Sequence, residues 1–179
     1  MRPPGDGLQY LLDRREIEDV LTRYFRGLDR GEPQTVRSCF TDDVVARYDG
    51  RTAFRSGNDA PVVGVDALLD GLITFKRQAS GDWKVSTHLA GQINLLSLNG
   101  DEAHTETYAI AYVVQRRTPT DVVAQRALRY VDRLHRTAKG WRIAERTHTL
   151  DWSTESPPLF ATTMNERFHG PASVAGDPV

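Results

Sequence analysis

The chain has very little cysteine and no long apolar run, and both absences limit what it can be. Cys39 is the only cysteine among 179 residues, which excludes an internal disulfide and a zinc site built from several cysteines. No apolar stretch approaches the ~20 residues of a membrane-spanning helix. The N-terminal segment also lacks the apolar core of a signal peptide. We therefore expect a cytoplasmic protein with no membrane partner, and we interpret Cys39 as a core residue.

The chain also lacks an excess of either charge. It holds 23 Lys and Arg against 24 Asp and Glu, so 23 − 24 gives a net charge of −1. A dedicated nucleic-acid-binding protein usually carries a basic excess, so we expect no nucleic-acid partner. Arginine makes up 20 of the 23 basic residues, which hints at a GC-rich bacterial genome. The length and the 39% of hydrophobic residues fit one globular domain.

Common catalytic motifs are missing as well. The chain has no Gly-rich phosphate loop, no G-x-S-x-G elbow and no H-E-x-x-H zinc motif. Any site must therefore be assembled from the five histidines and from polar residues on inward faces.

The first half of the chain predicts three helices, over residues 8–30, 33–40 and 65–76. Apolar residues recur at helical spacing in the first, and Gly31 is a stop signal after it. Strands are expected at 43–48, 84–98, 105–117, 122–137 and 141–152, with Asn99-Gly100 as a hairpin turn. Helices followed by strands indicate an α+β fold.

We therefore predict a curved antiparallel sheet that forms a half-open cone with three N-terminal helices. The concave inner face of such a cone is a natural ligand pocket. Residues 1–7 are expected to be a flexible tail, 8–152 the domain, and 153–179 a C-terminal extension with a short helix near 159–168.

Two polar residues stand out as candidates for chemistry. Asp29 lies at the edge of the apolar stripe in the last turn of the first helix, where a solvated helix end is the alternative interpretation. His88 begins a strand on which Gln92 and Asn94 share its face, which suits either solvent or a wet cavity. Imidazole is the usual general base near neutral pH.

Other polar and aromatic residues share strand faces. Arg146 and His148 lie on one face of the last strand. Aromatic side chains of the middle strand and of the strand after it could line a pocket or pack in the core. A buried Asp among them would need a partner. These residues are Tyr108, Tyr112, Tyr130 and Asp132.

The chain resembles the SnoaL-like proteins of the nuclear transport factor 2-like superfamily. The resemblance rests on segment 13–45, on the H-x-x-x-N-like strand that begins at His88, and on the closing hairpin 129–152. Matching positions of the opening segment are Ile17, Asp19, Tyr24, Asp29, Phe40, Asp42 and Asp43. The resemblance implies an NTF2-like, cystatin-like α+β cone, and a homodimer or homotrimer.

The resemblance also implies a function. Relatives include scytalone dehydratase, bile-acid dehydratase and hexachlorocyclohexane dehydrochlorinase, which eliminate water or HCl from cyclic substrates without cofactor or metal. By this similarity the chain is a lyase or isomerase acting on a hydrophobic cyclic small molecule. Its catalytic residues would be Asp29, His88, Tyr24 and Arg146, and its substrate-binding residues Tyr108, Tyr112, Asn94, Tyr130, Asp132 and His148.

The implied roles follow acid–base chemistry. Asp29 would orient His88, and His88 would remove a proton next to a carbonyl or a leaving group. Tyr24 would donate to a developing oxyanion, although it points about 140° away from Asp29 on an ideal helix. Arg146 would compensate negative charge. Two alternatives stay open: a non-catalytic binding or small-subunit module, and a polyketide cyclase or ketosteroid-isomerase-like enzyme with Asp29 as the base.

Overall fold

The computed structural model describes residues 7–49 and 60–163 of the chain. This part contains four helices and six strands. The helices are α1 (Gly7–Arg30), α2 (Pro33–Arg37), α3 (Val65–Gly71) and α4 (Ile73–Ala79). The strands are β1 (Phe40–Asp49), β2 (Val62–Val63), β3 (Trp83–Asn99), β4 (Glu102–Gln115), β5 (Val122–Thr137) and β6 (Gly140–Ser156). The helices and strands expected between residues 8 and 152 are all present, and the predicted α+β class is confirmed.

One curved sheet, which does not close into a barrel, carries all six strands in the order β2-β1-β6-β5-β4-β3. Strands β3 to β6 form the expected antiparallel meander. The sheet as a whole is mixed, because β1 pairs in parallel with β6. The junction is fixed where the amide of Ile143 donates to the carbonyl of Cys39 at 2.9 Å. A parallel pair needs a long connection, and nearly a hundred residues separate these strands.

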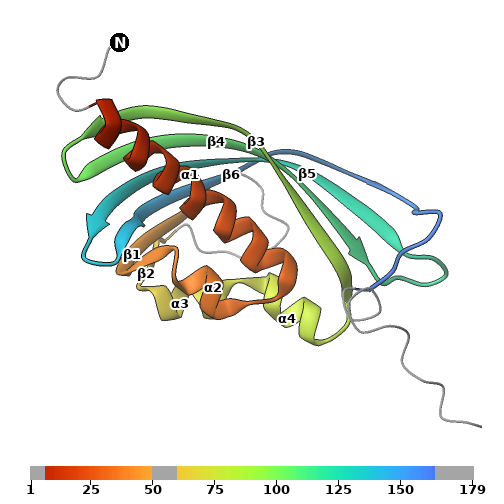
Figure 1. Ribbon diagram of the computed structural model, residues 1–179. Coiled ribbons are helices and arrows are strands. Elements are labelled where there is room, and N and C mark those ends of the chain that lie inside the picture. Colours follow the sequence, from red (N-terminus) through yellow and green to blue (C-terminus); the bar gives the residue numbers. More distant parts are fainter. Residues whose placement is uncertain (1–6, 50–59, 164–179) are drawn as a thin grey trace, which may run out of the picture.

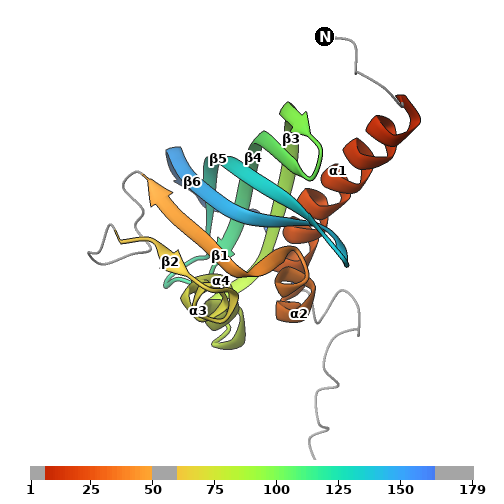
Figure 2. The same cartoon turned by 90° about the vertical axis from the view of Figure 1, so that its left-hand side faces the viewer.

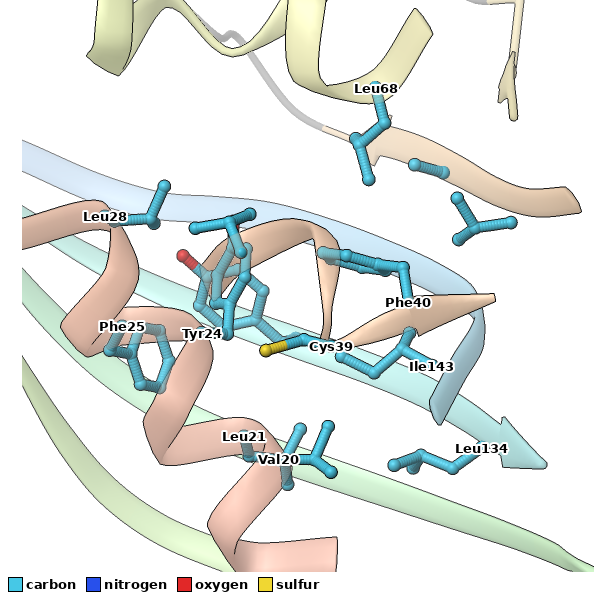
Figure 3. Packing of buried hydrophobic residues seen from close by; sticks show 14 of the residues in the cluster. Val20, Leu21, Tyr24, Phe25, Leu28, Cys39, Phe40, Leu68, Leu134 and Ile143 are labelled. Carbon is cyan, nitrogen blue, oxygen red and sulfur yellow. The ribbon is translucent and has the colours of Figure 1, made fainter. Parts of the chain in front are cut away.

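The helices lie on one side of the curved sheet (Figures 1 and 2). Helix α1 runs along this side, and its apolar stripe packs against the strands. Figure 3 shows Val20, Leu21 and Tyr24 of α1 in one apolar cluster with Phe40 of β1, Leu134 of β5 and Ile143 of β6. Cys39 is fully buried in the same cluster, which confirms that it is a core residue. The core therefore fills one part of the concave side and leaves the rest for a cavity.

Two helices differ from the sequence-based boundaries. The second helix ends at Arg37, since Phe40 already pairs with Ile143 as the first residue of β1. The third predicted helix is divided at Leu72, whose backbone is extended at ψ 99°. Gly71, a weak helix former, precedes the break. The division makes four helices from three, and it brings residues 71–74 to the wall of a cavity described below.

The ends of the described chain also refine the predictions. Strand β6 continues beyond Trp152 to Ser156. Residues 159–163 are not helical, so the predicted helix near 159–168 is wrong over these positions, and its remainder lies outside the described residues. Residues 1–6 of the predicted tail also lie outside the described residues. Helix α1 starts at Gly7. Within the described ranges, no helix has the length and apolar character needed to cross a membrane.

Candidate active site

Asp29 and His88 form a hydrogen-bonded pair between α1 and β3. The distance from Nδ1 of His88 to Oδ1 of Asp29 is 2.6 Å. The backbone N–H of His88 donates to Oδ2 of Asp29 at 2.8 Å. The Asp29 side chain is 20% exposed and the His88 side chain 8%. Two residues that are 59 positions apart in the sequence are thus held together by contacts to both carboxylate oxygens.

The end of α1 places the carboxylate. Gly31 follows the helix with φ of +66°, the left-handed conformation that terminates helices. Gln78 of α4 donates to the carbonyl of Leu28 at 3.0 Å and so ties α4 to this helix end. The hydroxyl of Ser86 donates to Oδ1 of Asp29 at 2.9 Å. The last turn of α1, where a carboxylate is disfavoured by the helix dipole, is therefore supplied with donors for Asp29.

These contacts decide the ionisation of Asp29 and the tautomer of His88. Burial by itself would raise the pKa of the Asp29 carboxyl, but the hydrogen bonds and charge of His88 and the Ser86 hydroxyl lower it overall. Asp29 is thus a carboxylate near neutral pH. A carboxylate only accepts hydrogen bonds, so Nδ1 of His88 carries the proton toward Asp29. The lone pair of a neutral His88 then lies on Nε2, where it can accept a proton.

A cavity of about 100 Å³ lies beside this pair on the concave side of the sheet. His88 contributes to its wall, whereas Asp29 does not. Most of the wall is apolar and comes from helices and strands alike, with Leu28, Leu72, Ile73, Val113, Leu128 and Leu150 as examples. Small-molecule sites are typically apolar hollows with a few convergent polar groups, and this cavity has that composition.

The polar part of the wall includes Tyr24, Tyr48, Tyr130 and His148. Burial raises the pKa of the Tyr24 and Tyr130 hydroxyls, so both stay protonated. The ring of His148 stacks on Tyr130, with centroids 4.8 Å apart, and meets Tyr48 edge to face at 5.5 Å. Burial, reinforced by the Arg146 charge, lowers the pKa of His148 to about 3. The cavity therefore has protonated phenols and a neutral imidazole in its wall.

The structure corrects the position predicted for Arg146 and Asp132. These residues face each other in the β5–β6 register, and Nε and Nη2 of Arg146 donate to the two oxygens of Asp132 at 2.7 Å each. Both are buried, and neither contributes to the cavity wall. The guanidinium lies over the Tyr24 ring at 4.2 Å. Burial by itself would lower the pKa of Arg146, but the Asp132 carboxylate raises it overall. A ligand in this cavity would therefore touch neither Arg146 nor Asp132.

Three other predicted substrate-binding residues lie away from the cavity. Tyr108 and Tyr112 are on the outer face of β4, where Tyr108 packs against the Arg129 guanidinium at 4.7 Å. Asn94 is exposed, because a β-bulge between Ala90 and Ile93 reverses the alternation of β3 after His88. The prediction that Tyr108, Tyr112 and Asn94 line the pocket is therefore wrong.

Some residues at the site were not predicted from the sequence. Ser86 is one of them, although it lies two positions before His88 and so on the same strand face, which was a usable signal. Tyr48, Trp83 and Arg126 also line the cavity. Burial lowers the pKa of Arg126 to about 10, which leaves it charged at neutral pH. Arg126 lies two and four positions before Leu128 and Tyr130 and so on the same face of β5, which was a usable signal as well.

A second, wider hollow meets the pair from the other side. Asp29 and His88 line it together with Phe160 and Thr162 of the segment that follows β6. Its volume is about 640 Å³. His88 therefore lies between the two hollows, with Asp29 on the wider one only. Among the described residues, no cluster of three or more His, Cys, Asp or Glu side chains could hold a metal ion.

Solved structures with the same fold are numerous. A candidate scytalone dehydratase from Novosphingobium aromaticivorans superimposes with a TM-score of 0.65 at 17% identity, covering 87% of this chain and 95% of that one. The hexachlorocyclohexane dehydrochlorinase LinA-type3 from Novosphingobium barchaimii gives 0.66 at 14% identity, covering 89% and 99%. The Kfla4162 protein from Kribbella flavida gives 0.66 at 18% identity, covering 81% and 95%. At these identities the similarity shows the shared fold.

The family follows from the sequence itself. No curated protein matches the chain. The family model described as the SnoaL-like domain matches residues 9–147, which is most of the sequence. A neighbour in the solved structures is described as an NTF2-like protein with a cystatin-like fold, in agreement with the curved sheet and its helices. The chain belongs to the SnoaL-like family.

Proposed function

We propose that the protein is a cofactor-independent lyase or isomerase that abstracts a proton from a hydrophobic cyclic small molecule. The observation that supports this proposal is the Asp29–His88 hydrogen bond of 2.6 Å at the wall of an apolar cavity. The SnoaL-like fold of dehydratase and dehydrochlorinase structures agrees with this class of reaction.

His88 is the general base of the proposed reaction. Its two ring nitrogens flank Cε1 and point in different directions. Nδ1 is directed at Asp29, which is absent from the wall of the apolar cavity, so in this proposal Nε2 is the nitrogen that faces the substrate there. Nε2 takes a proton from carbon, and the electron pair of that C–H bond forms an enolate or a new C=C bond. In an elimination the neighbouring leaving group departs with its own electron pair, and in an isomerisation the proton returns to another carbon.

Tyr24 is the proposed donor to the oxygen that becomes negative. Its hydroxyl is protonated because burial raises its pKa, and its ring lines the cavity. The cavity reaches beneath the C-terminal half of α1, so a residue five positions before Asp29 takes part despite its different helix face. Arg146, 4.2 Å behind the same ring, acts as a positioning residue in this proposal.

The alternative in which Asp29 is the base is less favoured. Oδ1 of Asp29 accepts from Ser86 and from Nδ1 of His88, and Oδ2 accepts from the backbone of His88. A carboxylate with these donors holds its charge tightly and is a weaker base. Asp29 also does not reach the apolar cavity.

Exchange of α-protons tests the proposal without knowledge of the natural substrate. Cyclic ketones such as cyclohexanone are incubated with the protein in D₂O, and deuterium at the α-carbons is followed by NMR. We expect the protein to accelerate exchange and His88→Ala to lose at least ~100-fold of that acceleration. Asp29→Asn, which cannot stabilise the imidazolium, should lose a similar amount.

His104→Ala is the matched control. His104 also has a carboxylate partner, Glu102, but its side chain is 45% exposed and lies outside the cavity. This variant should exchange ketone protons at the wild-type rate. No acceleration by the wild-type protein, or a fully active His88→Ala, contradicts the proposal. An Asp29→Asn variant that alone is inactive assigns the base to Asp29 instead.

A further inference from the structure

His148 is a buried polar side chain whose hydrogen-bonding capacity is unused. Both of its ring nitrogens are buried, and neither has a hydrogen-bond partner among the described residues. The ring itself borders the apolar cavity. It is fixed there by stacking on Tyr130 and by the edge contact with Tyr48. A buried polar group without a partner costs free energy, so its presence in the wall of a cavity points to a ligand atom.

The chemistry of this imidazole is that of a neutral group. With its pKa lowered to about 3, His148 is uncharged in the physiological range. A neutral imidazole offers one N–H donor and one acceptor nitrogen. Such a pair matches the oxygen of a carbonyl or a hydroxyl. The position does not suit a carboxylate, since only one of the two nitrogens can donate.

His148 and His88 reach the cavity from different parts of the sheet. His148 belongs to β6 and His88 to β3, and strands β5 and β4 lie between them. A molecule in the cavity therefore meets a base at one site and an oxygen-binding imidazole at another. The volume of about 100 Å³ is smaller than the about 150 Å³ of a cavity that holds benzene, so the space favours a single ring over a fused ring system.

We propose that His148 binds a second oxygen substituent of the substrate, so that the substrate is a single-ring compound carrying two oxygen functions. One oxygen function activates the carbon at His88, and the other forms a hydrogen bond with His148. The first half of this statement rests on the proposed function. The second concerns binding and can be measured in a protein that catalyses nothing.

The test compares 4-hydroxycyclohexanone with cyclohexanone, which differ by one hydroxyl. We expect wild-type protein to favour 4-hydroxycyclohexanone by about tenfold in the kcat/KM of α-proton exchange, as one hydrogen bond allows. In His148→Phe this preference should disappear, so that the two ketones exchange with about equal kcat/KM, whatever the loss for cyclohexanone itself. His148→Gln, which keeps a donor and an acceptor, should restore part of the preference. Circular dichroism confirms that each variant is folded.

A binding measurement separates this inference from the proposed function. In His88→Ala, calorimetry should still show tighter binding of 4-hydroxycyclohexanone than of cyclohexanone. If exchange is absent but this preference depends on His148, the proposed function fails and the His148 assignment stands.

Other outcomes overturn the inference. Equal losses for both ketones in His148→Phe would mean that His148 does not bind the second oxygen. A stronger preference for 4-oxocyclohexanecarboxylate that depends on Arg126 would assign the second contact to an anion. Binding of neither ketone would exclude the single-ring class.

Discussion

Two pairs of oppositely ionisable side chains, Arg146–Asp132 and His88–Asp29, lie on the concave side of this sheet. They differ in whether a member of the pair borders the cavity. Arg146 and Asp132 have side chains 4% and 0% exposed, and the pair does not reach the cavity. Asp29 and His88 are 20% and 8% exposed, His88 lines the cavity, and only its Nδ1 is bound to Asp29. Burial and charge are therefore insufficient to identify a site. The functional candidate is the pair that keeps a titratable atom at the cavity.

The largest expected effect is the loss of stability when the buried Arg146–Asp132 pair is broken. Arg146→Met leaves Asp132 as an unpaired buried charge, and we expect a loss of roughly 3–5 kcal/mol in the free energy of unfolding. Urea denaturation measures it. Arg129→Met is the matched control, because its partner Asp151 and Arg129 itself are 33% and 42% exposed. An exposed pair is worth at most about 1 kcal/mol.

The double variant completes this test. Asp132→Leu combined with Arg146→Met removes both charges, so much of the lost stability should return. If Arg146→Met unfolds as easily as the Arg129→Met control, the pair is not the structural element described above. Retained folding together with lost proton exchange would point to a direct role of Arg146 in the reaction.

Local patterns marked Asp29 and His88 as candidates, and the resemblance to SnoaL-like proteins implied their pairing and the role of His88 as base. The apolar stripe of α1 showed that Asp29 lies at the edge of its buried face. His88 lies before the bulge in β3, so strand alternation up to His88 is regular. Asn94 follows the bulge, so counting by twos placed it on the wrong face. The Arg146–Asp132 pair depends on the β5–β6 register, which the sequence alone does not determine. The chemistry of a pair was thus predictable, and its position relative to the cavity was not.

Strand β4 shows a second physical limit. Its inward positions carry small residues, including Ala109 and Ala111, while Tyr108 and Tyr112 face outward. A cavity needs space, and small inward residues such as alanine leave that space, whereas inward tyrosines would fill it. Ala111 and Val113 are the β4 residues in the cavity wall. The helices that cover this face, and so the preference for small side chains, become visible only in three dimensions.

The pH dependence of stability distinguishes His148 from the paired groups. Its pKa is about 3 in the folded protein against about 6.5 in the unfolded chain. Between these values only the unfolded chain binds the proton, so stability falls as pH falls from about 6.5 toward 3. The slope contributed is at most about 1.4 kcal/mol per pH unit.

Urea denaturation between pH 7 and 4.5 measures this slope in wild type and His148→Phe. The window lies above the range in which the lowered pKa of Asp29 matters, because that carboxylate loses its stabilising effect only as pH falls below its unfolded value of about 3.9. We expect the variant to have the flatter profile. Identical profiles would show that the pKa of His148 is not lowered by folding, contrary to its buried position.

The smallest expected effect is on kcat and concerns Ser86, which helps to orient the Asp29–His88 pair. Ser86 donates to Asp29 at 2.9 Å and accepts from Nε2 of Gln78 at 3.4 Å. Ser86→Ala removes one of three donors to the carboxylate, and a hydrogen bond of about 1 kcal/mol corresponds to roughly a fivefold loss of kcat in proton exchange. Because Ser86 is absent from the wall of the apolar cavity, the KM for a cyclic ketone should stay unchanged. Ser80→Ala, whose exposed hydroxyl donates to the carbonyl of Arg77, should leave both constants unaltered. A change in KM with constant kcat would place Ser86 in ligand binding and remove it from the support of Asp29.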